Sequence, residues 1–236
     1  QKVLYCYINL IKTRSIYGAS TMKTLFKAIA VASLATATAA QAELSASVAV
    51  DSEYVFRGVT VNDEATASAT LEYSIVGLTV GAWVADSDGT DGEETDLYVS
   101  YGLNAGGVDL GISYTDYSYD QNLGGQQEIA VSASIKGLGL SYTDGSNDLG
   151  GSDNADYSVI TLDYSLTNAN ILVGQVDSDD SNADYSFFAV SGSLGQVAGV
   201  EATLTYTGTF DEGTASDANG VESDSIVIGF SKAFDL

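Results

Sequence analysis

The residues of this chain that could perform chemistry are almost all carboxylates. The sequence has 32 Asp and Glu, 8 Lys and Arg, no His, and one cysteine, Cys6. Without His it lacks the usual general base and the commonest metal ligand, and a serine without an adjacent base is not activated as a nucleophile. Two carboxylates alone could act as a glycosidase or aspartyl pair, but no pair stands out from the acidic background. We therefore predict that the protein is not an enzyme and needs no cofactor.

One acidic stretch, DSDGTDGEE at residues 86–94, suggests calcium, because hard cations take clustered oxygen ligands. Its spacing does not match the loop of an EF-hand. We predict no firm metal site and keep Asp86, Asp88 and Asp91 as weak candidate ligands in this loop. The alternative is a solvated acidic loop. Loose divalent bridging to lipopolysaccharide phosphates is a further option.

The start of the sequence is typical of an exported protein. MKTLFKAIAVASLATATAAQA, residues 22–42, joins two lysines to an apolar run and a small-residue cleavage pattern, which predicts a secretory signal peptide. Residues 1–21 are interpreted as a non-native upstream segment. Beyond Ala42 three basic residues face all 32 acidic ones, a net charge of −29. We expect no nucleic-acid partner, since phosphate binding needs a basic surface.

The elements that position these carboxylates are expected to be strands, because side chains alternate between apolar and polar after residue 43. A typical segment is TASATLEYSI, where Leu71, Tyr73 and Ile75 share one face. Most segments have the 9–11 residues or so that a tilted strand needs to cross a bilayer. Twelve segments are predicted: 44–59, 65–76, 78–87, 95–104, 108–119, 127–136, 138–145, 155–167, 170–178, 184–195, 200–210 and 224–235.

The connections between these segments alternate in length. Those after even-numbered segments are short, such as Val76-Gly77 and Lys136-Gly137, and those after odd-numbered segments are longer or more acidic. Short turns at one rim and long loops at the other are typical of an outer-membrane barrel. The sequence therefore predicts one domain, residues 43–236, that forms an antiparallel up-and-down β-barrel of about 12 strands with short periplasmic turns and longer acidic extracellular loops.

The two faces of the segments favour a membrane over a soluble sandwich. The polar face consists mainly of Ser, Thr, Gly and Ala with isolated carboxylates, which suits a wet barrel interior, whereas a soluble sheet carries long charged side chains. The alternative, a secreted soluble β-sandwich, remains open. Aromatic residues on the apolar face gather near the strand ends as two expected interfacial girdles. They are Tyr54, Phe56, Tyr114, Tyr142, Tyr206 and Phe210 at the loop end, and Tyr73, Tyr101, Tyr164 and Phe234 at the turn end.

The stretch DSEYVFRGVT, residues 51–60, contains one of the three basic residues of the exported chain. Alternation places Tyr54 and Phe56 toward lipid, and Glu53 and Arg57 toward the lumen. There Arg57 would make charge-assisted hydrogen bonds with carboxylates. It could brace the barrel wall or help to constrict a pore, and the sequence leaves both possibilities open.

Inward parity predicts a set of pore-lining residues that would favour cations, as carboxylate rings do in other pores. In the alternative, these groups hydrogen-bond across strands and side chains fill the barrel. The predicted pore-lining residues are Asp51, Glu53, Arg57, Glu72, Asp109, Glu128, Asp163 and Glu201.

Two segments resemble known patterns. Ser52, Tyr54, Arg57, Gly58 and Thr60 match the pattern S-x-Y-x-x-R-G-x-[ST] of the first strand of TorF-type porins of Gram-negative outer membranes. This resemblance implies a transmembrane barrel and a transport role. The last segment, DSIVIGFSKAFDL, resembles the C-terminal strand signature that barrel-insertion machinery recognises, although it ends in Leu rather than Phe.

Together these features predict an outer-membrane, porin-like ion channel for passive diffusion of small polar solutes, with a preference for cations. Its expected partners are outer-membrane lipid and lipopolysaccharide, the insertion machinery and small solutes. The alternative is a non-conducting structural or adhesive barrel whose acidic loops bind an external partner or divalent cations.

Overall fold

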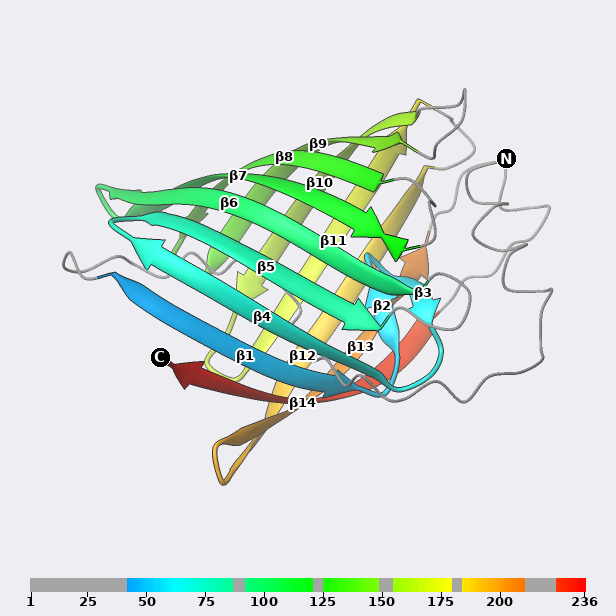
Figure 1. Ribbon diagram of the computed structural model, residues 1–236. Helices are drawn as coiled ribbons and strands as arrows, with labels where there is room; N and C mark the ends of the chain where they lie inside the picture. The colour runs from blue at the N-terminus through cyan, green and yellow to red at the C-terminus, as the bar shows by residue number, and fades with distance from the viewer. Residues whose placement is uncertain (1–41, 87–91, 121–124, 149–154, 180–183, 211–223) are drawn as a thin grey trace.

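The computed structural model describes residues 42–86, 92–120, 125–148, 155–179, 184–210 and 224–236. Twelve antiparallel strands form a closed barrel in which each strand pairs with its neighbours in sequence, and β1 closes the ring against β14 (Figure 1). Two short strands, β2 and β3, form a separate hairpin. The described residues contain no helix long and apolar enough to cross a membrane.

The wall strands are 9 to 13 residues long, so that their length matches the requirement of a tilted strand in a bilayer. Their bounds are β1 Glu43–Asp51, β4 Thr66–Ile75, β5 Leu78–Asp86, β6 Glu93–Ala105, β7 Val108–Tyr119, β8 Gly125–Ile135, β9 Leu138–Asp148, β10 Ala155–Ser165, β11 Ala169–Ser178, β12 Tyr185–Val197, β13 Val200–Phe210 and β14 Asp224–Asp235. The hairpin strands are β2 Tyr54–Phe56 and β3 Val59–Asn62.

Two of the short turns at one rim have the same backbone conformation. Val76-Gly77 and Lys136-Gly137 both have two consecutive positive φ angles, 49° and 81° in the first and 53° and 84° in the second. Two positive φ angles in a two-residue loop define the type I′ turn, whose twist matches that of the paired strands. Glycine in the second position makes this conformation accessible, so these dipeptides fix the strand register at the short-turn end of the barrel.

The outward face is a continuous apolar surface. Leu71 is 50% exposed, Ile112 51% and Phe230 51%, although each lies in the middle of a paired strand. A soluble protein would not leave such residues exposed over a whole surface, whereas lipid contact requires it. Eight of the ten predicted girdle aromatics are exposed on this face: Tyr73, Tyr101, Tyr114, Tyr142, Tyr164, Tyr206, Phe210 and Phe234.

The inward face is less polar than the sequence predicts. Tyr157, Val159, Val176 and Phe187, from β10, β11 and β12, form a buried cluster inside the barrel. These residues occupy the parity that was expected to hold small polar side chains. The expected wet lumen is therefore wrong for this part of the wall, where apolar side chains fill the interior.

The fold confirms the predicted antiparallel barrel and its twelve wall strands. The first predicted strand, 44–59, is wrong in its second half, because β1 ends at Asp51. Asp51 pairs with Thr66 at the start of β4, so the two wall strands are adjacent and the chain between them leaves the wall. In Figure 1 the hairpin in this connection, drawn in cyan, lies near the long-loop end of the barrel.

Candidate functional site: a hairpin inside the barrel

The hairpin β2–β3, residues 54–62, is called the lumen hairpin here because its side chains contact the inner wall. Arg57 and Gly58 form its turn, with φ angles of 49° and 78°, the same conformation as Val76-Gly77 and Lys136-Gly137 at the barrel rim. The tight turn is possible because Gly58 has no side chain. It places Arg57 at the tip, where its side chain can reach the far wall.

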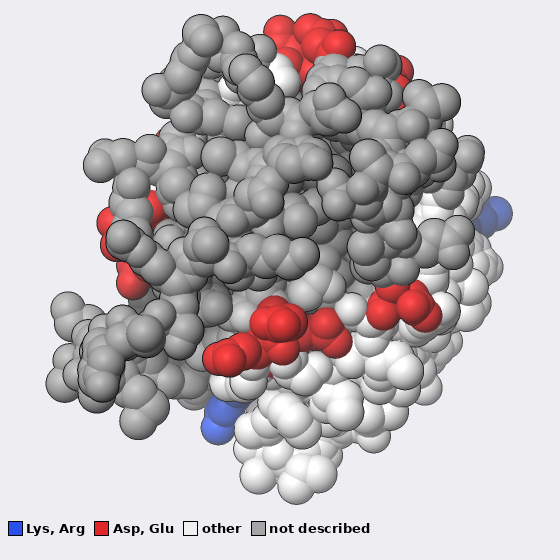
Figure 2. All heavy atoms as spheres, turned by 90° about the vertical axis from the view of Figure 1, so that its right-hand side faces the viewer, with Lys and Arg blue, Asp and Glu red and all other residues white. Residues whose placement is uncertain are grey.

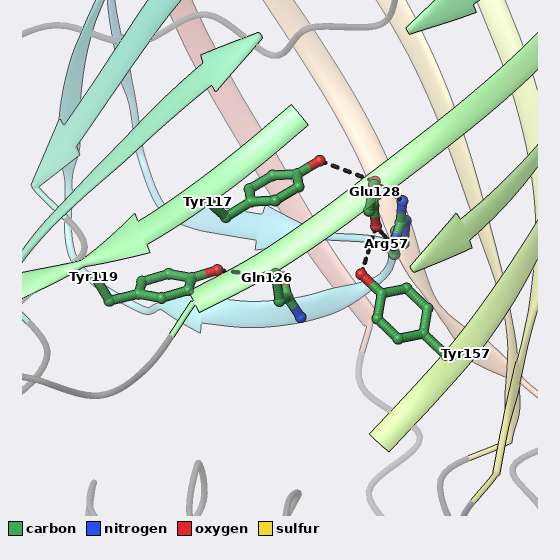
Figure 3. Close-up of polar contacts among 6 residues, drawn as sticks. All are labelled: Arg57, Tyr117, Tyr119, Gln126, Glu128 and Tyr157. Carbon is green, nitrogen blue, oxygen red and sulfur yellow. Dashed lines mark hydrogen bonds and ion pairs between the residues drawn. The ribbon is translucent and has the colours of Figure 1, made fainter. Parts of the chain in front are cut away.

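Arg57 at the tip is held by a carboxylate of the wall (Figure 3). Its two terminal nitrogens donate to both oxygens of Glu128 on β8, at 2.7 Å and 3.0 Å. Tyr117 on β7 and Tyr157 on β10 donate their hydroxyl hydrogens to the same carboxylate, at 3.0 Å and 2.7 Å. A bidentate arginine–carboxylate pair is among the strongest side-chain contacts, and the two phenols satisfy the remaining acceptor capacity of Glu128.

The charges of this contact are removed from water. The Arg57 side chain is 17% exposed and that of Glu128 is 7% exposed. Burial acts to lower the pKa of the Arg57 guanidinium, but the charge and hydrogen bonds of Glu128 outweigh it, so the pKa lies above its usual value. Arg57 is therefore fully charged at any working pH. Removal of either partner would leave an uncompensated charge in a confined site.

The other residue of the turn contacts the opposite side of the barrel. A methyl group placed on Gly58 would lie 2.7 Å from the carbonyl carbon of Gly208 on β13, and closer still to its oxygen; it would also lie 3.0 Å from Phe187 on β12. In the ring of strands, β8 and β13 are separated by four strands on the shorter path. Two consecutive residues thus reach two distant parts of the wall, which means that the tip bridges the lumen.

The strands of the lumen hairpin are fixed to the wall as well. The Tyr54 ring packs on Trp83 of β5 at 6.0 Å, and the Phe56 ring packs edge-on against Tyr117 at 6.2 Å. The Thr60 hydroxyl lies 3.3 Å from the Ser225 hydroxyl on β14. These aromatic residues were predicted to face lipid. That prediction is wrong, because the chain turns inward after Asp51 and carries both rings into the barrel.

Tyr54 also carries an acid–base consequence of its position. Its hydroxyl lies 3.4 Å from a carboxylate oxygen of Glu94 on β6. Burial first, and then the negative charge of Glu94, raise the pKa of Tyr54 well above its usual value. The phenol therefore stays protonated and acts as a hydrogen-bond donor rather than as a charge in the lumen.

Glycines in the wall make room for the tyrosines that bind carboxylates. A side chain at Gly145 on β9 would overlap the ring of Tyr157, which crosses β9 to reach Glu128 on β8. Gly81 on β5 underlies Tyr98 in the same way, and Tyr98 crosses that strand to donate to Glu72 on β4 at 2.7 Å. Tyr157 and Tyr98 thus each lie over a glycine and connect three adjacent strands.

The predicted pore-lining residues fall into two groups. Glu53, Arg57 and Glu128 belong to the long-loop half, where Glu53 accepts a hydrogen bond from Ser225 at 2.9 Å. Asp51 ends β1 and is 9% exposed, beside Gly229 of β14. The remaining four lie on the inward face toward the short turns, and among the described residues none of them forms a hydrogen bond or ion pair with the hairpin: Glu72, Asp109, Asp163 and Glu201.

The short-turn half of the lumen is acidic without a matching cation. Asp109 accepts from the Asn104 amide at 2.8 Å, and Asp163 lies against the backbone of Gly139. Lys136 stands in an exposed turn, and Lys232 lies over the outward-facing Phe234 at 5.4 Å. These lysines and Arg57 are the only basic residues beyond Ala42, and within the described ranges none of them forms an ion pair with Glu72, Asp109, Asp163 or Glu201.

The weak metal candidates are only partly visible. Asp86 is the exposed last residue of β5, and Asp88 and Asp91 lie outside the described residues. Within the described ranges, no group of three or more potential ligands is arranged to hold a metal ion. In Figure 2, which faces the long-loop end, carboxylates form separate patches around the rim.

Sequence reasoning missed the hairpin and three of its partners, Trp83, Tyr117 and Tyr157. One local signal could have revealed the turn. Arg57-Gly58 has the same residue-plus-glycine form as Val76-Gly77 and Lys136-Gly137, for which the sequence predicts turns. A glycine inside an apparent strand also indicates a break or a close backbone approach. The wall partners have no local signal, because Glu128 is 71 residues from Arg57.

Comparisons with known proteins support the architecture. No protein-family model matches the sequence, and no curated protein matches it either. The COG4313 outer membrane channel from Pseudomonas putida F1 aligns with 89% of this chain over its whole length, with a TM-score of 0.50 and 12% identity. A second structure is described as "Unveiling the Mechanism Behind the in-meso Crystallization of Membrane Proteins". Its alignment covers 83% of this chain and 84% of the chain in that structure, with a TM-score of 0.55 and 9% identity. The chain therefore has the fold of outer-membrane barrel channels.

Proposed function

We propose that the protein is an outer-membrane, porin-like channel that lets small polar solutes diffuse passively and prefers cations. The observation that carries this proposal is a closed barrel with an apolar outer surface and, in its short-turn half, four inward carboxylates without a basic partner. Carboxylates clustered in the wall of a pore raise the local concentration of cations and repel anions.

The resemblance to TorF-type porins supports the same role. All five residues of the matching pattern lie in or beside the lumen hairpin and have a physical task there. Ser52 exchanges two hydrogen bonds of 2.9 Å with the Ile228 backbone, which anchors the chain where it leaves the wall. Tyr54 and Thr60 contact the wall, and Arg57 and Gly58 form the tip.

The proposal is tested by recording the refolded protein in planar bilayers under a KCl gradient. We expect discrete conductance steps and a reversal potential of the sign that cation selectivity gives. A preference for anions would contradict the charge argument. Heat-modifiable migration on a gel checks that the same sample contains a folded barrel.

A second candidate, a non-conducting structural or adhesive barrel, is favoured by one observation. The lumen hairpin and the cluster around Phe187 occupy the long-loop half of the interior. If these elements close the path, folded protein inserts into bilayers without conductance steps. Deletion of the acidic loops would then impair binding to an external partner rather than permeation.

A further inference from the structure

The lumen hairpin lies inside the barrel, but its two strands are not part of the sheet that forms the wall. β2 and β3 pair only with each other in the described sheets, while β1 pairs directly with β4 beside them. The closed ring of twelve strands therefore does not need the hairpin. Removal of the hairpin would break no ladder hydrogen bond of the wall, so the pairing of the wall strands does not hold it in the lumen.

The contacts that keep the hairpin inside are concentrated at its tip. Arg57 makes two charge-assisted hydrogen bonds to Glu128 on the wall. The contact of the guanidinium with the Phe56 ring, 4.6 Å from the ring centre, lies within the hairpin and does not attach it to the wall. Along the strands the polar contacts involve uncharged hairpin groups: the Asn62 amide donates to Thr66 of β4 at 3.0 Å, and 3.4 Å and 3.3 Å separate Tyr54 from Glu94 and Thr60 from Ser225. Arg57 is the only charged residue of the lumen hairpin, so among the described residues its ion pair with Glu128 is the one charge-to-charge contact between the hairpin and the wall.

We infer that the lumen hairpin is a gate across the long-loop half of the channel, and that the Arg57–Glu128 ion pair is its latch. The inference rests on the proposed channel function. With the latch closed, the tip bridges β8 and β13 and narrows the passage. With the latch broken, the buried charge favours water over the lumen wall, and the hairpin moves toward the long-loop rim.

The latch also explains the two tyrosines beside it. Tyr117 and Tyr157 donate to Glu128 from β7 and β10, so they hold the carboxylate in place on the wall whether or not Arg57 is bound. Because the Glu128 carboxylate is already ordered, less conformational entropy is lost when Arg57 binds it. Tyr117 and Tyr157 are therefore positioning residues for the latch.

The experiment uses single cysteines in the full chain, with Cys6→Ser as background. Thr60→Cys reports hairpin position, because Thr60 is half-buried against β14 in the closed state. Its reaction with a membrane-impermeant maleimide is measured with and without Glu128→Gln. We expect labelling and single-channel conductance both to rise several-fold when Glu128→Gln removes the latch. The control is Glu72→Gln. It also removes one negative charge, but Glu72 accepts its hydrogen bond from Tyr98 and not from the hairpin, so the labelling rate of Thr60→Cys should stay unchanged.

A second experiment uses a disulfide bond that holds the hairpin against the wall of the Glu128→Gln variant and can be reduced again. Thr60→Cys and Ser225→Cys place two thiols where the native hydroxyls lie 3.3 Å apart. In the Glu128→Gln background, we expect low conductance after oxidation and high conductance after reduction in the same bilayer. Heat-modifiable migration confirms that every variant contains a folded barrel.

The possible outcomes separate the gate from the channel. Faster labelling without a change in conductance would show that the hairpin moves but does not control passage, which overturns the gate. An unchanged labelling rate in Glu128→Gln would overturn the latch. If the hairpin is released and all forms remain silent, the proposed channel function fails together with the gate. A silent wild-type protein with a conducting Glu128→Gln variant would support a gate that closes fully.

Discussion

The two halves of this barrel interior use their charges in opposite ways. In the long-loop half, Glu128 is neutralised by Arg57 and surrounded by tyrosines, so that its charge holds a structural element in place. In the short-turn half, Asp109 and Glu201 face the lumen without a basic partner. The same residue type thus serves attachment at one end and, as we propose, selectivity at the other. The difference arises because a basic side chain, Arg57 of the lumen hairpin, binds Glu128, whereas no basic side chain of the described residues binds Asp109 or Glu201.

The largest effect is expected from removing the element that distinguishes the halves. Because Asp51 and Thr66 are paired neighbours in the wall, a short Gly/Ser turn can replace residues 53–64 without straining the ring. We expect a several-fold rise in single-channel conductance, since the bridge across the lumen is gone. Unchanged conductance in a barrel that still shows heat-modifiable migration would mean that the constriction lies elsewhere.

The short-turn half can be changed while the hairpin is left in place. Glu72→Gln, Asp109→Asn, Asp163→Asn and Glu201→Gln together remove four negative charges from the lumen. We expect the cation preference to fall strongly, because the field that excludes anions comes from these groups. Reversal potentials in a KCl gradient measure the change. Glu93→Gln, on an exposed residue at the long-loop rim, is the matched control and should change selectivity far less.

Substitution of Gly58 tests the bridging geometry without altering any charge. In Gly58→Ala the new methyl group would overlap the Gly208 carbonyl oxygen, and the positive φ of 78° becomes unfavourable. The left-handed conformation alone costs roughly 1–2 kcal/mol for a residue with a Cβ. We expect faster maleimide labelling of Thr60→Cys than in the parent. Gly106→Ala, at an open turn with φ of 66° and no neighbouring atoms, controls for the backbone effect alone.

A smaller effect is expected from the tyrosines around Glu128. Tyr157→Phe removes one hydrogen bond to a buried carboxylate, which is worth about 1.5–3 kcal/mol for a charged acceptor. The urea midpoint of the barrel in detergent should fall, because the phenol connects β10 to β8 across β9. Tyr206→Phe is the matched control, since its hydroxyl bonds Asp224 on the exposed outer surface, and its midpoint should stay at the parent value.

Much of the fold follows from local patterns. Alternation with period two gives each strand and its two faces, and dipeptides such as Val76-Gly77 give the turns and the register. The alternation of turn and loop lengths then orders the strands as an up-and-down ring. The interior was harder to predict, because Val159 and Phe187 lie on the inward parity but pack on one another rather than facing water. Whether an inward side chain packs or faces water depends on its neighbours in adjacent strands, which the alternation along one strand does not reveal.

The candidate site shows the limit of this reasoning more sharply. Glu128 and Arg57 were both placed inward by parity, but nothing in their sequence positions indicated that they meet. The first predicted strand continued to residue 59 because β2 alternates like a wall strand, and a hairpin strand inside the barrel has the same period as a strand in its wall. The S-x-Y-x-x-R-G-x-[ST] pattern marked the correct residues, although their location was misjudged.

The sequence by itself determined a closed barrel of twelve strands with an apolar outer surface, because backbone pairing and side-chain alternation are local properties that repeat along the chain. Only the tertiary structure decided that residues 54–62 turn into the barrel and that Arg57 binds Glu128. That contact joins residues 71 positions apart. Its existence depends on the curvature of the closed wall, which brings β8 and β13 within reach of a single turn.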